Sequence, residues 1–195
     1  IRSIAMEGGM GPVAGSSHHS IYQRMPGTKI LSPMTPKEYI YSYRKFMSDD
    51  DVYYISEHRA SYDNTEELQD VILEDSDITF FPISVTRFAA EEARKKLTSD
   101  GIKVSIIHQL WIKPFILKDK WLACLNKSKF GGLVMDDDYE QGVASSIAHE
   151  IMIKSNKSVF ALGLDHRTAG FHHSVDNLPP DSEKIIKKVL EILNV

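Results

Sequence analysis

The segment ITFFPISVTRFAAEEARKKLTSDGIKVSII, residues 78–107, decides the fold class of this chain. It begins with an apolar, β-rich run, continues with a helical pattern over residues 88–99 that ends at Asp100-Gly101, and closes with a β-branched run over residues 103–107. A strand, a helix and a second strand in this order predict a right-handed crossover between two parallel strands. The predicted fold class is therefore α/β.

The residues after this segment continue the alternation of strands and helices. Residues 181–193 carry apolar side chains at the 3.6-residue spacing of a helix that lays one face on a sheet, and core packing explains this pattern fully. We predict one α/β domain over residues 75–195, within the usual size of about 100–150 residues. Its further elements are expected to be helices at 117–125 and 142–154 and strands at 132–135 and 159–164.

The residues before this domain predict a smaller unit with a parallel sheet. Thr35 is the expected cap of a helix that has Pro36 at its first position and runs to about Met47. A glycine- and serine-rich loop lies between the first two strand patterns. The strands are expected at residues 1–6, 28–32 and 52–55.

Polar, aperiodic residues at 59–64 mark the boundary between the two units. We assign residues 1–60 to the first unit and residues 61–74 to a linker. A parallel sheet normally has cover on both faces, and the first unit has few elements to provide it. We therefore expect it either to dimerise or to stay mobile, with several apolar side chains poorly covered. These are Ile30, Leu31, Val52 and Ile55.

The composition is that of an ordinary globular protein. Of 195 residues, 42% are hydrophobic and 26% are charged, which excludes disordered and fibrous classes. The net charge of -4 gives no general attraction for nucleic acid or anionic membranes, and no apolar run approaches the length of a membrane span. Cys124 is single and lies in an apolar stretch, so it is interpreted as a core residue in a reducing compartment. The expected location is the cytoplasm, or the mitochondrial matrix in a eukaryote.

Two short motifs share residue types with known binding sites but lack a residue that each site requires. Residues 9–14, GMGPVA, fit a dinucleotide fingerprint, but Pro12 lacks the amide that a pyrophosphate needs. His149-Glu150 would need a second histidine four residues on to bind zinc, and that position holds Ile153. The sequence supports neither site.

Acidic and histidine clusters give weaker candidates. The run from Asp136 to Asp138 follows a strand at the edge where α/β sheets bind ligands, yet a solvated acidic loop is the favoured interpretation. Each of the pairs His18-His19 and His172-His173 offers at most one metal ligand, because adjacent side chains on an extended chain point to opposite sides. A polar loop is the favoured interpretation of His172-His173.

Eight short motifs follow one another in a fixed order along the chain. They are GGMG at 8–11, HS at 19–20, PGTKILSP at 26–33, GIKV at 101–104, LWIKPF at 110–115, GLVMDD at 132–137, GV at 142–143 and LPP at 178–180. In this order they resemble a family of thiamine-diphosphate-dependent enzymes, the transketolase-like proteins, and most of all the beta subunits of 2-oxo acid dehydrogenases of the pyruvate, branched-chain and acetoin type. The resemblance covers essentially the whole chain.

This resemblance implies a split of function along the chain. Residues 1–60 correspond to the last part of a pyrimidine-binding domain, and residues 75–195 to a three-layer transketolase C-terminal domain. In the family, the glutamate that activates the pyrimidine precedes the residues that match residue 1, and the diphosphate and its magnesium are held elsewhere. The chain begins at Ile1, not at Met, so we expect a processed or truncated piece that is inactive alone.

The resemblance also implies site residues. It places the family's active-site histidine at His19, or less favourably His18, as a proton donor or electrostatic stabiliser. It further implies a potassium ion held by backbone oxygens of Phe46, Asp49 and Asp51, although a solvated acidic turn explains the same residues. The stretch from Ser20 to Met25 is shorter than in typical dehydrogenase beta subunits and is nearer to transketolase spacing.

The predicted function is part of an enzyme that acts on 2-oxo acids or ketoses. It requires thiamine diphosphate and magnesium, and its expected partner is an alpha subunit or the N-terminal part of the same enzyme, in a homo- or hetero-oligomer. Two alternatives stay open: a non-catalytic module for subunit assembly, and a flavodoxin-like regulatory or nucleotide-binding domain suggested by the α/β alternation alone. Fold by itself does not decide among them.

Overall fold

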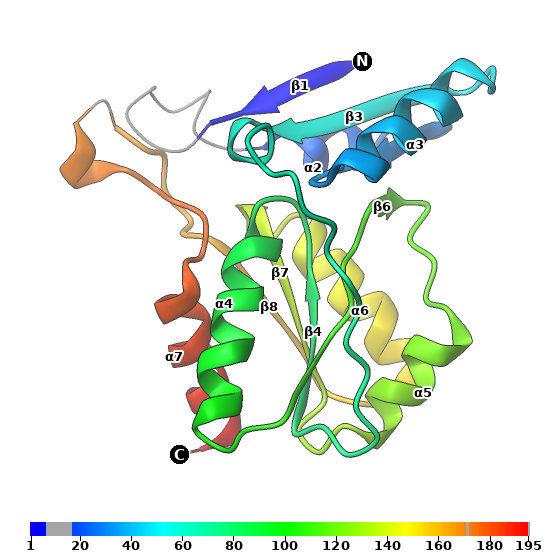
Figure 1. The fold of residues 1–195 in the computed structure, drawn as a ribbon. Coiled ribbons are helices and arrows are strands. Elements are labelled where there is room, and N and C mark those ends of the chain that lie inside the picture. The colour runs from blue at the N-terminus through cyan, green and yellow to red at the C-terminus, as the bar shows by residue number, and fades with distance from the viewer. Residues whose placement is uncertain (7–16, 171, 195) are drawn as a thin grey trace.

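Two sheets, each of four strands, organise the chain (Figure 1). The structure is a computed structural model that describes residues 1–6, 17–170 and 172–194. The first sheet, at the top of Figure 1, has the order β1-β3-β2-β6, and the second has the order β5-β4-β7-β8. The strands of the two sheets are β1 (Arg2–Ala5), β2 (Thr28–Leu31), β3 (Val52–His58), β4 (Ile78–Pro82), β5 (Val104–Ile106), β6 (Trp111–Lys113), β7 (Gly132–Tyr139) and β8 (Val159–Leu164).

Helices cover both faces of the second sheet, which makes it the middle of three layers. On one face, α4 and α7 bury apolar side chains against Phe80, Leu133 and Met135; on the other, α5 and α6 pack on Phe81 and Val134. All pairs within this sheet are parallel, as the strand-helix-strand pattern predicts. The helices are α2 (His19–Gln23), α3 (Pro36–Met47), α4 (Thr86–Ser99), α5 (Asp119–Lys127), α6 (Val143–Ser155) and α7 (Ser182–Leu193), with short 3₁₀ turns η1 (Arg59–Ser61) and η2 (His173–Val175).

The chain therefore has the predicted α/β fold class, with a parallel-sheet remnant followed by a three-layer α/β domain. Several elements differ in length from the sequence prediction. The strand expected at 52–55 continues to His58, and the one at 132–135 continues to Tyr139. The helix expected at 117–125 lies at Asp119–Lys127, and the short α2 and β6 had no prediction.

The first sheet is better covered than the sequence suggested. Ile30 and Leu31 are fully buried and Ile55 is 3% exposed, so the expectation of poor cover is wrong for these three; Val52 is exposed. The reason is that Ile30 and Tyr54 belong to the same apolar cluster as Phe81, Val134 and the α5–α6 layer. One continuous core runs between the two sheets.

Strand β6 joins the two units through backbone hydrogen bonds. It lies within the residues expected for the C-terminal domain, yet it pairs antiparallel with β2, with Ile30 opposite Lys113 and Leu31 opposite Trp111. The Ser32 amide also donates to the Leu110 carbonyl, at 2.9 Å. The boundary at residues 61–74 stays a prediction, and β6 crosses between the units that it would separate.

Thr35 does not cap α3 with its side chain, contrary to expectation. Its hydroxyl donates to Glu67 at 2.7 Å, and the Lys37 amide donates to the other oxygen of Glu67 at 2.9 Å. A carboxylate at the first turn satisfies an amide that has no partner in the helix and is stabilised by the helix dipole. The connecting segment thus provides the cap.

Asp181 is the side-chain cap of α7. It accepts a hydrogen bond from the Lys184 amide at 2.7 Å. We expect Asp181→Ala to lower the free energy of unfolding by about 1 kcal/mol, the usual cost of losing a cap. Asp119→Ala serves as the control, because Asp119 lies in the first turn of α5 without being its cap. Urea denaturation measures both variants, and equal losses would contradict the prediction.

Candidate functional site

The end of β7 carries three consecutive aspartates that are buried between the two units. Asp136, Asp137 and Asp138 are exposed by 0%, 1% and 4%. The favoured interpretation of this run as a solvated loop is therefore wrong. The strand continues through the aspartates because nearby donors satisfy their oxygens, and a buried carboxylate needs such partners.

Hydroxyls and amides from four segments bond to these carboxylates. Asp137 accepts from the Ser17 hydroxyl at 2.6 Å and from the Ser84 hydroxyl at 2.7 Å. Asp138 accepts from the Ser20 amide at 3.1 Å, and one Asp136 oxygen accepts from the Asp137 amide at 2.9 Å. The cluster thus links α2 and its preceding residues to the ends of β4 and β7.

His19 is the centre of this cluster. Its side chain is fully buried at the start of α2, with Nε2 at 2.7 Å from an Asp136 oxygen and Nδ1 at 3.1 Å from the Ser56 hydroxyl on β3. The Asp138 carboxylate lies 4.0 Å from the same Nε2. Both ring nitrogens are bonded to protein oxygens, so the imidazole connects the first sheet to the second.

The electrostatics of the cluster favour a protonated His19. Burial alone would lower the pKa of the imidazole, but the charge and hydrogen bond of Asp136 and the charges of Asp137 and Asp138 outweigh it and raise the pKa to about 9. Burial and the charge of Asp136 raise the pKa of Asp137. Nearby His58 behaves in the opposite way: burial lowers its pKa. The arrangement is an ion pair enclosed between two units.

A metal ion is the other species that such a cluster could hold. His19, Asp136 and Asp137 each offer one atom, and these atoms lie within 4.8 Å of one another. However, the Asp136 oxygen lies at hydrogen-bond distance from Nε2, and both Asp137 oxygens accept hydroxyl hydrogens. A cation would have to displace the imidazole proton and these donors. We therefore interpret the cluster as an ion-pair network.

Most of the other sequence candidates that the structure describes lie apart from this cluster. His18, at the N-cap of α2, is only partly buried. His149 is exposed, and Glu150 pairs with Lys154 at 2.6 Å, so no zinc site forms there. The rings of His172 and His173 lie against each other at 4.1 Å on the surface. The glycine-rich residues 8–14 lie outside the described residues.

The predicted potassium turn carries an ion pair of its own. The Asp49 carboxylate accepts from the Lys29 ammonium and from the Tyr53 hydroxyl, both at 2.7 Å, and Asp51 also contacts Lys29. The Phe46 ring packs edge-on against Tyr53. Lysine already supplies a positive charge beside these side chains. The backbone-oxygen site for potassium stays a prediction.

Sequence reasoning missed the serines and the second contact between the units. Ser17, Ser56 and Ser84 come from three separate segments, and no motif or spacing in the sequence connects them. Arg87, fully buried on α4, makes a two-point pair with Glu38 on α3, at 2.6 and 2.7 Å. The three successive aspartates were the available signal of this site, because they follow a buried strand at its carboxyl end, where α/β sheets place their functional groups.

Comparison with solved structures places this fold among transketolases. The chain is similar to an inactive beta4 tetramer of a split-gene transketolase, at 16% identity and a TM-score of 0.72 over all of this chain and 66% of that one. A transketolase from Pichia stipitis aligns at 15% identity and TM-score 0.73, over 100% of this chain and 30% of that one. A transketolase from Campylobacter jejuni aligns at 12% identity and a TM-score of 0.69, over 97% of this chain and 31% of that one.

At identities this low, the similarity shows the fold alone. The chain has a transketolase-like C-terminal fold, and it spans about a third of the longer transketolase chains. No protein-family model and no curated protein matches the sequence. These comparisons do not show that the chain is more similar to dehydrogenase beta subunits than to transketolases. None of the described helices is long and apolar enough to cross a membrane.

Proposed function

We propose that this chain is a subunit or segment of a thiamine-diphosphate-dependent enzyme of the transketolase type. It supplies the end of the pyrimidine-binding domain and the C-terminal domain, and it is inactive without the remaining parts. One observation carries the proposal: both sheets, in their mutual arrangement, align with transketolase chains at TM-scores near 0.7. A common α/β domain alone would account for the second sheet only.

The residues described here do not fit thiamine diphosphate by themselves. In the buried cluster, where polar groups gather, both nitrogens of His19 and both oxygens of Asp137 are already bonded within the chain. The cluster carries acids but no free cationic group that could hold a diphosphate. The cofactor and its magnesium therefore belong, in this proposal, to the partner chain or preceding segment. When bound, the cofactor supplies the carbanion chemistry.

The contacts of His19 restrict its role in the isolated chain. As a proton donor to an intermediate, it would have to leave Asp136 and Ser56, which hold both its nitrogens. In the described arrangement it positions α2 and the residues before it against β7. We propose this positioning role for the resting subunit, with catalysis by His19 or His18 confined to the full assembly.

The substrate class has two candidates. Neighbouring structures include transketolase complexes with xylulose 5-phosphate and fructose 6-phosphate, which favours ketoses. The PGTKILSP and LWIKPF motifs favour the 2-oxo acids of dehydrogenase beta subunits. Oligomerisation is supported by the tetramer of the split-gene protein.

Co-expression of the chain with the polypeptide encoded immediately upstream tests the proposal. We expect the isolated chain to show no ketol transfer and no 2-oxo acid decarboxylation with thiamine diphosphate and magnesium, and the co-expressed pair to be active. Xylulose 5-phosphate with ribose 5-phosphate, and pyruvate with ferricyanide, separate the two substrate classes. Turnover by the isolated chain above a buffer control would contradict the proposal.

A non-catalytic assembly module is the second candidate. The cluster around His19 favours it, because His19, Ser17 and Ser20 bond to the aspartates of β7 and thereby hold the two units together. The same experiment separates the candidates. A stable complex that neither binds thiamine diphosphate in calorimetry nor turns over any of these substrates would support the assembly module.

A further inference from the structure

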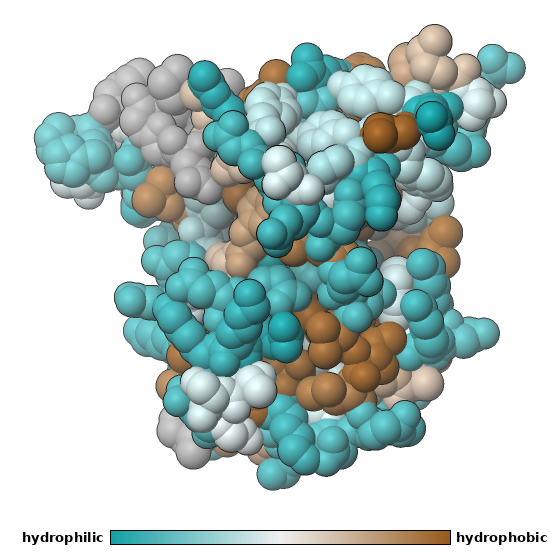
Figure 2. Space-filling model, in the orientation of Figure 1, coloured by the Kyte–Doolittle hydropathy of each residue, from teal (hydrophilic) through white to brown (hydrophobic). Residues whose placement is uncertain are grey.

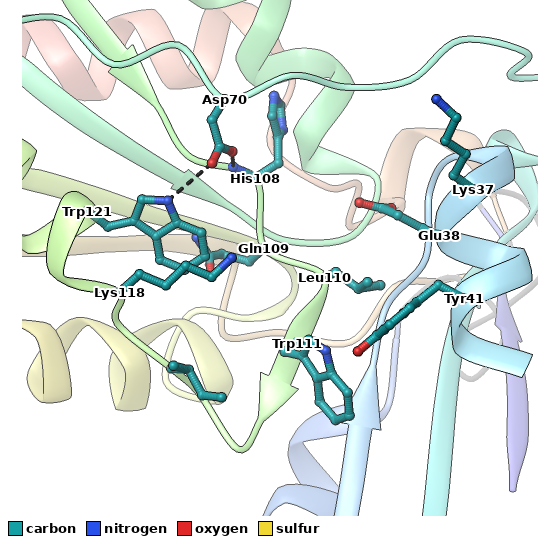
Figure 3. Close-up of a pocket in the computed structure, with 11 residues that line it drawn as sticks. Lys37, Glu38, Tyr41, Asp70, His108, Gln109, Leu110, Trp111, Lys118 and Trp121 are labelled. Carbon is teal, nitrogen blue, oxygen red and sulfur yellow. Dashed lines mark hydrogen bonds between the residues drawn. The ribbon is translucent and has the colours of Figure 1, made fainter. Parts of the chain in front are cut away.

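A cavity of about 540 Å³ lies where α3 meets the segment that leads through β6 to α5. Its volume is that of a small-molecule site, and such sites favour the junction between units. Figure 3 shows Trp121 and Lys118 on one side, Tyr41 on the opposite side, and Trp111 from β6 between them. The cavity is separate from the cluster around His19.

Aromatic side chains form much of its wall. Tyr41 and Trp111 meet edge to face, with ring centres 6.5 Å apart. The Lys118 ammonium lies over the Trp121 ring, 4.3 Å from its centre. Figure 2 shows that an apolar area also lies on this face of the lower unit. Flat aromatic walls of this kind favour a flat ring, which can stack on them or meet them edge to face.

The carboxylates that line the cavity are already occupied. One oxygen of Asp70 accepts from the His108 amide at 3.0 Å, and the other accepts from the Trp121 indole at 3.1 Å. Both oxygens of Glu38 accept from the buried guanidinium of Arg87. These acceptors are fixed by the fold, so they have little capacity left for a ligand.

The donors that line the cavity are not occupied in the same way. Among the described residues, none accepts a hydrogen bond from the Tyr41 hydroxyl, the Trp111 indole or the Lys118 ammonium. Lys37 also lines the cavity, and its backbone amide, not its ammonium, is the group that donates to Glu67. Lys118 is the lysine that lies beside the Trp121 ring. The lining thus has two lysines beside the Asp70 carboxylate, while the Glu38 carboxylate is paired with Arg87. A surplus of donors calls for a ligand that supplies acceptors.

We propose that this cavity binds a small organic anion that carries a flat ring. The ring lies against the aromatic wall formed by Tyr41 and Trp111, and a carboxylate or phosphate on it accepts from Lys118. A charge-assisted hydrogen bond of this type is about twice as strong as a neutral one. The binding is independent of the proposed enzymatic function and uses none of its residues.

Intrinsic fluorescence reports on this cavity directly, because Trp111 and Trp121 are the two tryptophans of the whole chain. AMP and 4-hydroxybenzoate are the probes with a ring and an anion, one a phosphate and the other a carboxylate. Adenosine provides a ring without charge, and inorganic phosphate an anion without a ring. We expect a saturable fluorescence change with AMP, 4-hydroxybenzoate or both, and weaker binding of adenosine and of phosphate.

Variants connect the signal to the residues. Lys118→Met should weaken binding about tenfold, the loss of one charge-assisted hydrogen bond. Tyr41→Ala should also weaken it, and both side chains are exposed, so the variants should fold. Lys120→Met is the matched control, since Lys120 is an exposed lysine two residues away that does not line the cavity.

The outcomes decide the proposal in either direction. A saturable change that Lys118→Met weakens and Lys120→Met leaves unchanged supports it. No saturable change with either AMP or 4-hydroxybenzoate in the millimolar range would overturn it, and so would equal affinity of wild type and Lys118→Met. Adenosine binding as tightly as AMP, with 4-hydroxybenzoate silent, would overturn the anionic part. Which of the two probes binds tells phosphate from carboxylate.

Discussion

Raising the pH from 6.5 to 9 is expected to lower the free energy of unfolding by up to about 3 kcal/mol, because a tenfold change in an equilibrium constant is worth about 1.4 kcal/mol. The cause is His19. Its imidazole has an ordinary pKa of 6.5 in the unfolded chain and about 9 in the folded one. Below 6.5 the stabilisation is fully present, and it is lost as the pH rises through 9.

Other groups in the cluster act in ways that the experiment can separate. The pKa of Asp137 is also raised, by burial and by Asp136, so this carboxyl acts in the same direction as His19. Burial lowers the pKa of His58 and of His108, so these two histidines reduce stability as the pH falls below 6.5. The difference between wild type and a His19 variant gives the contribution of the imidazole together with its effect on Asp137, whose pKa the charge of His19 lowers.

His19→Gln is the variant that removes the charge and keeps a donor. It should lower the free energy of unfolding at pH 6.5 by about 3 kcal/mol, within the range for breaking a buried pair. It should also flatten the slope between pH 6.5 and 9. His166→Gln, an exposed histidine, is the control and should leave both unchanged. Urea denaturation across this pH range measures both, and an unchanged slope in His19→Gln would refute the ion pair.

The fold could be predicted from the sequence where local patterns decide it. Residues 78–107 give a strand, a helix and a strand because their apolar periodicity and the Gly101 turn agree with the parallel sheet that forms. The glycine adopts a φ of 86°, a conformation that other residues rarely take. Strand β8 lies where its apolar run placed it, at Val159–Leu164.

Contacts between distant segments could not be predicted in this way. The sequence gives no reason for His19 to meet Asp136 across 117 positions, or for β6 to pair with β2 of the first sheet. The aspartates after Met135 look like a polar turn in isolation, because their burial depends on donors from Ser17, Ser20 and Ser84. Whether a polar side chain is buried depends on contacts with distant segments, whereas the periodicity of apolar residues can be read from one short stretch of sequence.

Arg87→Leu is expected to lower the free energy of unfolding by about 3–5 kcal/mol, the cost of removing one partner from a buried ion pair. The Arg87 side chain is fully buried on α4, and the Glu38 carboxylate on α3 is 18% exposed. Two parallel hydrogen bonds of 2.6 and 2.7 Å join them, so the pair ties the first sheet to the second. The variant leaves Glu38 with a charge and without its main donor.

A double-mutant cycle separates the pair from the cost of an isolated charge. Arg87→Leu with Glu38→Leu should regain part of the loss, since replacing both partners of a buried pair by apolar groups is often close to neutral. The coupling between the two sites should reach about 1–3 kcal/mol. The Lys96–Glu92 pair on the surface of α4 is the control, and Lys96→Ala should cost about 0.5 kcal/mol or less.

Hydrogen exchange shows which parts of the structure Arg87→Leu destabilises. If the pair ties the units together, Arg87→Leu should speed amide exchange in β2 and β3 of the first sheet more than in β4 and β7, because each unit can then open separately. The second sheet has helices on both faces and should keep slow exchange. A loss of less than about 1 kcal/mol, or equal acceleration in both sheets, would show that the apolar core around Ile30 and Phe81 joins the units without help from Arg87.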